Sequence, residues 1–392
     1  MTPVLTQRTP MPTHNLPTHR NRVVDGLRAL AMIGVVSGHW LVTGLATDAD
    51  GALHQQSPLR QLPMLVPLTW ILQTLGLFFF VSGYTAVTGS IRAPTRNRAQ
   101  ARWLATRARR LLPPITVFAV LWLLTCAALH ATHVAAPTQH VVSRLMISPL
   151  WFVLVVLLLS AMTPSLSAAE RRLGPGLALA PLAAVAVVDL ARFAVWPAMP
   201  QWLTYLNGVT GWLVPYVLGV SMARGHLHGR RVGTALVLAG IVAGALLIVV
   251  AGYPASAVGV PGEGRSNLAP PSLLTVALSL VQIGLALMAW KRLERLLERS
   301  AWWATVTALS LSAMTVFLWH QTALLIVAGT GHAFLRDPAG LIGAPDETSW
   351  LVHRLAWLPV FAGVLALLRL LFRSAERFSY STRTANSERK TP

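Results

Sequence analysis

The sequence contains 392 residues, of which 54% are hydrophobic and only 11% are charged. Soluble domains carry roughly 25% charged residues, so this composition excludes an ordinary soluble domain and predicts a polytopic membrane protein. The net charge of +19 would suit a nucleic-acid partner, but the positions of the basic residues along the chain argue against one.

About ten apolar stretches are long enough to cross a bilayer, because a helix of ~20 residues spans the hydrocarbon core. They cover residues 24–45, 67–90, 111–130, 150–168, 177–195, 202–223, 233–252, 272–290, 303–329 and 351–372. We therefore expect an all-α fold, a bundle of about ten transmembrane helices. One integral domain would extend over residues 23–374, between a disordered cytoplasmic tail at 1–22 and a basic cytoplasmic tail at 375–392.

The Lys and Arg residues are distributed unevenly between alternate loops. With a cytoplasmic N-terminus, the inside segments hold 25 of the 32 basic residues, and two more lie within spans. The outside loops hold the other five, Arg60, Arg144, Arg265, Arg336 and Arg354. Because basic loops stay in the cytoplasm, this asymmetry predicts that both termini lie inside and that the chain belongs to the plasma (inner) membrane. The charge then orients the chain and contacts anionic lipid, and no nucleic acid is needed.

The first span carries three ionisable side chains, Asp25, Arg28 and His39, in an otherwise apolar helix. At ~100° and ~1.5 Å per residue, Arg28 and His39 return to within ~20° of one face and lie about 16 Å apart along the axis. Ionisable residues inside a membrane are costly and usually face a bundle interior or a water-filled path. A general base must be neutral, and burial favours the neutral imidazole. We therefore interpret His39 as a catalytic residue rather than a structural hydrogen-bonding group.

Asp25 and Arg28 are one helical turn apart, and two roles are open for them. They could form an ion pair that fixes the mouth of the helix, or Asp25 could hold Arg28 in position for an anionic ligand. The two roles are compatible.

The internal loop before the third span is rich in arginine. Arg107 and Arg110 are one turn apart, so they can converge on one phosphate or diphosphate. Their sign and their predicted cytoplasmic side suit a phosphorylated donor. Simple positive-inside flanking is the alternative for this pair, and it is the preferred explanation for Arg92, Arg96 and Arg98.

Other polar and aromatic residues within the spans carry weaker signals. Trp151 opens the fourth span, where an anchor in the aromatic belt explains it as well as a substrate contact does. His320 lies late in the ninth span, where a structural hydrogen bond is the simpler role. Asp189 and Arg192 in the fifth span are spaced to neutralise each other and are interpreted as structural.

Several motifs of other chemistries are missing from the sequence. It has no Walker loop, no HExxH motif and no paired-cysteine site, and Cys126 is its only cysteine. The sequence therefore disfavours ATP hydrolysis and zinc chemistry, and we expect no metal cofactor.

A proton-coupled transporter or flippase is the alternative to an enzyme. Its relay or substrate path would use the ionisable residues of the spans, Asp25, Arg28, His39 and His320. The absence of a visible internal repeat disfavours it, and so does an arginine pair at the cytoplasmic mouth.

Together, these motifs resemble those of acyltransferase family 3, a family of integral membrane proteins. The specific element is the spacing of Arg28 and His39, an Arg-x10-His pattern that begins within Asp-Gly-Leu-Arg-Ala-Leu-Ala at 25–31. The other matching pieces follow in the order of the family and are residues 79–84, Arg107-x-x-Arg110 before Leu-Leu-Pro, 150–152 and 317–320. The resemblance extends from about residue 22 to 373, and Tyr84 stands where the family more often has Phe.

The resemblance implies a ten-helix bundle that moves an acyl group from cytoplasmic acyl-CoA, acetyl-CoA by default, to a hydroxyl of an acceptor. The acceptor would be a carbohydrate, a cell-envelope glycan or a glycosylated metabolite. His39 would be the general base on the acceptor hydroxyl, and Asp25 would orient Arg28. Arg107 and Arg110 would bind the phosphates of CoA, and an acyl-histidine intermediate is an open variant. Candidate contacts to the oxyanion or the substrate are Ser82, Tyr84, Trp151 and His320.

Overall fold

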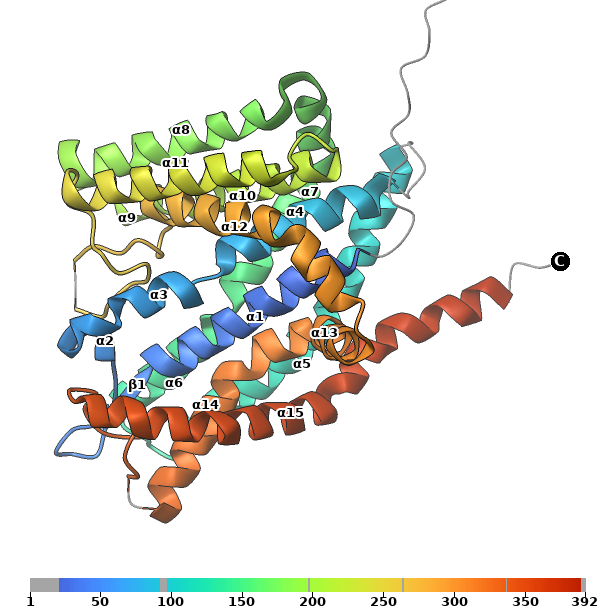
Figure 1. The fold of residues 1–392 in the computed structure, drawn as a ribbon. Coiled ribbons are helices and arrows are strands. Elements are labelled where there is room, and N and C mark those ends of the chain that lie inside the picture. Colours follow the sequence, from blue (N-terminus) through green and yellow to red (C-terminus); the bar gives the residue numbers. More distant parts are fainter. Residues whose placement is uncertain (1–20, 92–96, 197, 263, 336, 389–392) are drawn as a thin grey trace, which may run out of the picture.

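The computed structural model describes residues 21–91, 97–196, 198–262, 264–335 and 337–388, and for residues 90–91, 97–102, 110 and 373–388 it describes the backbone alone (Figure 1). The first half of the chain contains α1 (Arg22–Val42), β1 (Gly44–Thr47), β2 (Leu53–Gln56), α2 (Pro58–Gln61), η1 (Pro63–Leu65), α3 (Val66–Leu72), α4 (Leu75–Ile91), α5 (Asn97–Ala131), α6 (Ala136–Ile147), α7 (Leu150–Leu173), η2 (Gly174–Ala178), α8 (Leu179–Leu190) and η3 (Ala191–Val195). The second half contains α9 (Gln201–Thr204), α10 (Asn207–Ala223), α11 (Arg230–Val249), α12 (Leu273–Leu297), α13 (Ser300–Leu311), α14 (Ala313–Leu335) and α15 (Thr348–Glu388). Most of the predicted tails, residues 1–20 and 389–392, lie outside the described residues.

Eight helical stretches of the described chain are long and apolar enough to cross a membrane. They are Pro63–Gly89, Trp103–Ala131, Ala136–Val195, Gln201–Ala223, Arg230–Val249, Leu273–Leu297, Ala313–Leu335 and Thr348–Phe372. The predicted all-α, polytopic membrane fold is thereby confirmed. α1, the helix with Asp25 and Arg28, is not among the eight. The number of ten spans and the cytoplasmic location of the termini stay predictions.

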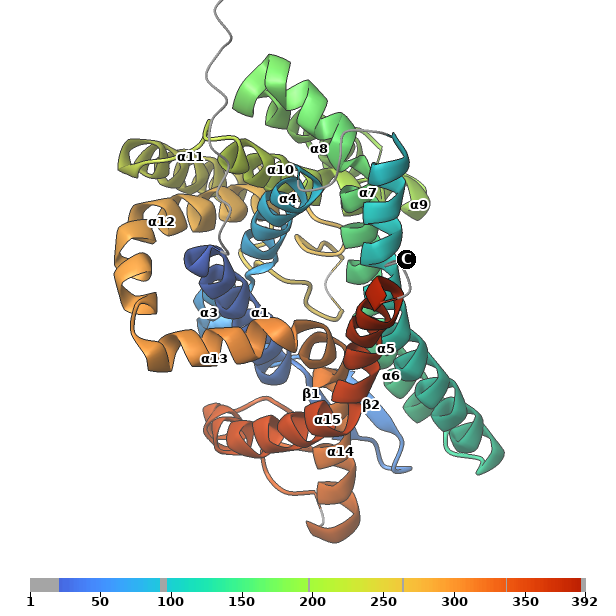
Figure 2. The ribbon, with the colours of Figure 1, turned by 90° about the vertical axis from the view of Figure 1, so that its right-hand side faces the viewer.

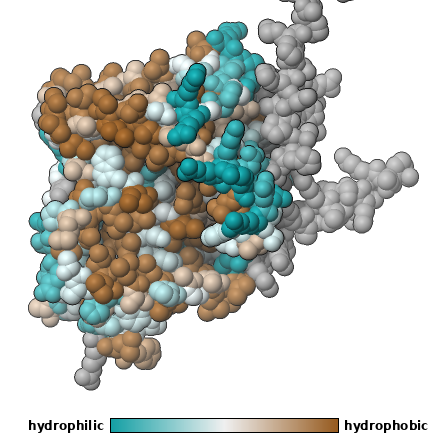
Figure 3. Space-filling view, viewed as in Figure 1, coloured by the Kyte–Doolittle hydropathy of each residue, from teal (hydrophilic) through white to brown (hydrophobic). Residues whose placement is uncertain are grey.

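The outer surface of the bundle is apolar over a wide area (Figure 3). Large apolar side chains point outward from α5, α11 and α15, and Leu123, Val249 and Leu371 are 71%, 81% and 61% exposed. Soluble monomers rarely expose contiguous apolar patches of more than a few hundred Å². This surface is typical of a protein whose helices contact lipid.

The loops 44–66, 131–149, 253–271 and 330–350, which the sequence predicts to be external, lie together at one end of the bundle, on the left of Figure 1. The β1–β2 hairpin, which lies in the loop 44–66, is hydrogen-bonded to the loops 131–149 and 330–350. The Leu53 amide donates to the Thr138 hydroxyl at 2.9 Å, and the Gly343 amide donates to the Leu45 carbonyl at 2.9 Å. α1 and α5 begin at the opposite end, which we call the α1-start end.

The second predicted span, 67–90, matches the apolar stretch Pro63–Gly89, and its helix is interrupted at Gln73 and Thr74, between α3 and α4. The break is stabilised by neighbouring helices. Gln282 of α12 donates its side-chain N–H to the Gln73 carbonyl at 2.6 Å, and the Thr74 hydroxyl donates to the Ala31 carbonyl of α1 at 2.7 Å. A broken helix is tolerated at membrane depth where such partners are present.

The ninth predicted span, 303–329, is also two helices. α13 ends at Ser312, whose backbone leaves the helical region and whose hydroxyl donates to the Ala308 carbonyl. α13 then lies crosswise to α14, as the two views together show (Figures 1 and 2). Apolar periodicity could not reveal this bend, because both helices are mainly apolar and the apolar pattern continues across it.

Asp189 connects several helices, which agrees with its predicted structural role. Its side chain is 1% exposed and accepts hydrogen bonds from the Asn207 amide, the Tyr253 hydroxyl and the Leu273 backbone N–H at 3.0, 3.0 and 2.8 Å. A buried carboxylate with three donors is well satisfied. Among the described residues, Asp189 forms no close ion pair with Arg192.

α4 and α10 cross at backbone contact. A methyl group on Gly83 would meet the Tyr216 carbonyl, and one on Gly219 would meet the Phe80 carbonyl. Gly83 therefore lets the two backbones approach closely, and Gly219 is its counterpart on α10.

We expect Gly219→Ala to lower the free energy of unfolding by about 1–3 kcal/mol, because the added carbon must push two backbones apart. Thermal unfolding of the purified protein measures this loss. Gly208→Ala is the matched control on the same helix, since nothing lies within 4 Å of its added carbon. Equal unfolding temperatures for the two variants would contradict the crossing.

Candidate active site

α1 is enclosed by other helices along its length and carries the predicted site residues. It contacts α3, α4, α12, α13 and α14, as the view from the α1-start end shows (Figure 2). Asn21 begins the helix, and its side-chain oxygen accepts from the backbone N–H groups of Val23 and Val24 at 3.0 and 3.3 Å. His39 lies in the last turn, at the end where the loops gather.

α14 supplies the partners of His39. The side-chain nitrogen of Gln321 lies 3.1 Å from His39 Nδ1, and the centres of the His39 and His320 rings are 5.0 Å apart. The Trp40 indole donates to the His320 carbonyl at 2.9 Å, which fixes the two helices together at this level. The sequence pointed to His39 and His320 separately; their contact, and the role of Gln321, come from the meeting of two distant helices.

His320 is oriented by its own helix. Its Nδ1 lies 2.7 Å from the Phe317 carbonyl, which can only accept, so Nδ1 carries the hydrogen. Nε2 of the neutral ring is then an acceptor, and it is buried without a hydrogen-bond partner among the described residues. In this state His320 cannot donate to an oxyanion, which argues against that predicted role.

Arg354 holds the end of α1 from α15. Its side chain donates to the Trp40 and Gly340 carbonyls at 2.7 and 2.9 Å and also to the Thr43 carbonyl. The residue is 0% exposed, and its guanidinium lies about 5 Å from the centres of two aromatic rings. The assignment of Arg354 to an outside loop was wrong. A cation inside an apolar stretch was the available signal, and its carbonyl partners are too far away in the sequence to be foreseen.

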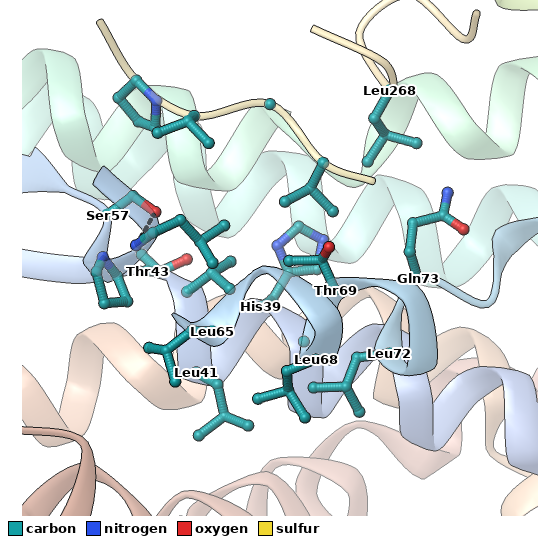
Figure 4. A pocket seen from close by; sticks show the side chains of 18 of the residues that line it. His39, Leu41, Thr43, Ser57, Leu65, Leu68, Thr69, Leu72, Gln73 and Leu268 are labelled. Carbon is teal, nitrogen blue, oxygen red and sulfur yellow. Dashed lines mark hydrogen bonds between the residues drawn. The ribbon is translucent and has the colours of Figure 1, made fainter. Parts of the chain in front are cut away.

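A cavity of about 440 Å³ lies beside His39, and we call it the His39 cavity (Figure 4). Its walls come from α1, the β1–β2 loop region, α3 and the loop 253–271, with Arg144 of α6 and Leu351 of α15 also in the lining. The His39 ring projects among Thr43, Thr69 and Gln73 in Figure 4. A cavity of this volume holds a small organic molecule.

Asp25 and Arg28 form the predicted pair at the other end of α1. Arg28 Nη1 lies 3.2 Å from Asp25 Oδ1, and the two side chains are 24% and 7% exposed. Tyr84 belongs to this end, because its hydroxyl accepts from the Asn21 side chain at 3.4 Å, and Ser82 lies within a turn of it on α4. The structure therefore separates Ser82 and Tyr84 from His39.

Arg107 lies on α5, which begins at the α1-start end. Its guanidinium is 5.8 Å from the centre of the Trp103 ring, the residue is half-buried, and its Nε atom is buried. Arg107 therefore faces the bundle rather than the surroundings. The side chain of Arg110 lies outside the described residues.

Trp151 begins a line of aromatic rings that ends at His320. Its ring stacks on Trp212 with centres 6.2 Å apart and meets the edge of Phe152 at 6.0 Å. Phe152 contacts Phe317 at 4.5 Å, and Phe317 contacts His320 at 5.9 Å. Trp151 is 40% exposed at the outer end of this line. It lies outside the His39 cavity.

The described residues contain no group of three or more His, Cys, Asp or Glu side chains that could hold a metal ion.

These features define an all-helical membrane protein with an ionisable helix inside the bundle and a cavity at the histidine end of that helix. The chain matches the model of an acyltransferase domain over residues 21–372, nearly its whole length. It therefore belongs to acyltransferase family 3, as the sequence resemblance implied, and is a membrane acyltransferase. No curated protein and no solved structure matches the chain.

Proposed function

We propose that the protein transfers an acyl group, acetyl by default, from acyl-CoA to a hydroxyl of an acceptor held in the His39 cavity. Such an acceptor would be a carbohydrate, a cell-envelope glycan or a glycosylated metabolite at the plasma membrane. The observation that carries the proposal is the position of His39, which lines a cavity at one end of α1 while the same helix carries Asp25 and Arg28 at the other. His39 can thus meet an acceptor from one side and a donor from the other.

The contact with Gln321 supports His39 as the general base. A base must offer one ring nitrogen to the acceptor and keep its hydrogen on the other. The side-chain amide of Gln321 can present either its oxygen or its nitrogen to Nδ1, because the two arrangements differ only by a rotation of the amide. With the oxygen toward Nδ1–H, the other nitrogen, Nε2, is free to accept a proton.

The acyl transfer then takes place in two steps, attack on the thioester and collapse of the tetrahedral intermediate. His39 Nε2 takes the proton of the acceptor hydroxyl as that oxygen attacks the carbonyl carbon of the thioester. The tetrahedral intermediate collapses, the carbon–sulfur bond breaks, and the CoA sulfur takes the proton from His39. The products are the acyl ester and free CoA.

The donor would bind from the α1-start end. Arg28 is held by Asp25, and Arg107 is half-buried on α5. CoA carries a diphosphate and a further phosphate, so arginines at this end would favour its binding through charge-assisted hydrogen bonds. Arg110 is proposed as a second phosphate contact from its spacing to Arg107.

Binding of acetyl-CoA tests the donor half directly. We expect Arg107→Ala to raise the Kd of acetyl-CoA about tenfold, the effect of losing roughly 1.4 kcal/mol of charge-assisted contact. Isothermal titration calorimetry on the purified protein in nanodiscs measures this Kd. Arg109→Ala removes the same charge from the exposed side of the same helix and should leave the Kd unchanged.

Release of CoA from acetyl-CoA by the wild-type protein tests the reaction itself. CoA release that is faster than the spontaneous hydrolysis of acetyl-CoA without protein supports the acyltransferase. A protein that neither binds nor consumes any acyl-CoA tested would instead be examined as a transporter or flippase, and the proposed function would be abandoned.

A further inference from the structure

The His39 cavity is mainly apolar. Leucine and valine side chains from α1, α3 and the loop 253–271 form much of its wall, among them Val35, Leu41, Leu68, Leu72, Val258 and Val260. All of its lining residues belong to the described chain, and they include no carboxylate and no Trp, Tyr or Phe ring. Such a wall provides neither flat rings nor acidic acceptors to bind the hydroxyl-rich faces of a sugar.

Much of the hydrogen-bonding capacity of the lining hydroxyls is already used by the protein. The Thr69 hydroxyl donates to the Val66 carbonyl at 2.6 Å and accepts from the Ala257 backbone N–H at 3.0 Å. The hydroxyl oxygens of Ser57 and Ser266 accept from backbone N–H groups of their own loops. A hexose would bring about five hydroxyl groups, and each buried group without a partner is costly.

Gln73 is a polar lining residue whose side-chain amide has unused hydrogen-bonding capacity. It is 6% exposed, and its Nε2 is buried without a hydrogen-bond partner among the described residues. The break between α3 and α4 places its side chain on the cavity, on the far side of Thr69 from Thr43 in Figure 4. An unpartnered buried donor of this kind fits an oxygen atom of a bound molecule.

Arg144 is the charged side chain of the lining. It is exposed, and it belongs to α6 at the loop end of the bundle. Because the described lining residues include no carboxylate, this guanidinium favours a neutral or anionic occupant over a cationic one.

From this lining we propose that the acceptor is an apolar alcohol that carries a second oxygen and is neutral or anionic. Its hydroxyl would meet His39, its second oxygen would accept from Gln73 Nε2, and its hydrocarbon body would contact the leucine side chains. A terminal carboxylate would lie toward Arg144. The inference rests on the proposed acyl transfer to a hydroxyl, and it replaces the carbohydrate acceptor that the family resemblance implies with an apolar alcohol.

Protection of a cysteine in the cavity tests this binding without requiring turnover. Leu68→Cys in a Cys126→Ser background places the single thiol on the cavity wall. We expect 3-hydroxydecanoate to slow labelling by N-ethylmaleimide about fivefold at a concentration near four times its Kd, by mass action. Maltose at the same concentration should leave the rate unchanged. Met64→Cys, exposed at the same end but outside the lining, is the control for effects on the bilayer.

A second set of labelling measurements distinguishes an alcohol that enters from the membrane from one that enters from water. Diacylglycerol built into the nanodisc presents the same hydroxyl and ester oxygens from the membrane, whereas 3-hydroxydecanoate arrives from water. Protection by either compound supports an apolar alcohol and identifies its source. Gln73→Leu should remove most of that protection while leaving unprotected labelling as before.

Two results would overturn the inference. One is protection by maltose with none by either alcohol, and the other is protection by no compound. The labelling experiment tests binding alone, whereas the proposed function is tested by acetyl transfer, so the two can fail independently. Acetylated maltose would keep the acyltransferase and refute the apolar acceptor. Protection by the alcohol without CoA release would support the apolar ligand and refute the acyltransferase.

Discussion

His39→Ala is expected to slow CoA release from acetyl-CoA by about 10²- to 10⁴-fold, the usual contribution of a positioned general base. This loss of rate is expected from the immediate surroundings of His39. His39 is the imidazole on the cavity wall, and Gln321 is in place to hold the hydrogen on its other nitrogen. Water can replace the acceptor hydroxyl in a first assay, because it needs the same proton acceptor. The Kd of acetyl-CoA should stay within about twofold of wild type, since a loss confined to the transition state lowers kcat alone.

His54→Ala is the matched control for that variant. His54 lies at the same end of the bundle, in β2, and its Nε2 lies 2.8 Å from Asp48 Oδ2. Neither residue belongs to the cavity lining. Both variants remove one imidazole, so a loss specific to His39 cannot come from the number of histidines. Equal rates for wild type and His39→Ala, with both proteins folded, would refute the base and leave the family assignment intact.

The sequence was most informative along α1. The separation of Arg28 and His39 and the pairing of Arg28 with Asp25 depend only on helical periodicity, which a local pattern contains. The structure confirms the pair and puts the two ionisable ends of the helix where that periodicity predicted. It also divides the other candidates, since Ser82 and Tyr84 lie at the Arg28 end and His320 lies at the His39 end.

The rest of the site depends on contacts between elements far apart in the sequence. Gln321 and Arg354 are polar residues within apolar stretches, and their partners on α1 become visible only when α14 and α15 pack against it. The cavity exists because the second predicted span breaks at Gln73 and because the loop 253–271 folds over α3. Hydropathy averages over such a break, so it predicts the span but not the interruption within it that forms part of the cavity wall.

Arg354→Met is expected to lower the free energy of unfolding by about 3 kcal/mol or more, because it leaves buried carbonyls without a donor. The side chain bridges the carbonyls of Trp40, Thr43 and Gly340, so it also holds the last turn of α1 against the loop after α14. Cations are favourable at a helix C-terminus, and this one is fully buried there. Arg354→Lys should recover only part of the loss, since a single ammonium cannot span a fork of three acceptors.

The measurement is thermal unfolding of the two variants in the same nanodiscs, with acetyl-CoA hydrolysis recorded below the transition. Arg60→Met is the control, because Arg60 is an exposed arginine at the same end of the molecule. If Arg354 acts only on stability, its variants will hydrolyse acetyl-CoA normally at temperatures where they are folded. We expect instead that folded Arg354→Lys shows a lower kcat with an unchanged Kd for acetyl-CoA, because the turn that Arg354 holds is the one that carries His39. An unfolding temperature for Arg354→Met equal to that of Arg60→Met would remove the basis for both expectations.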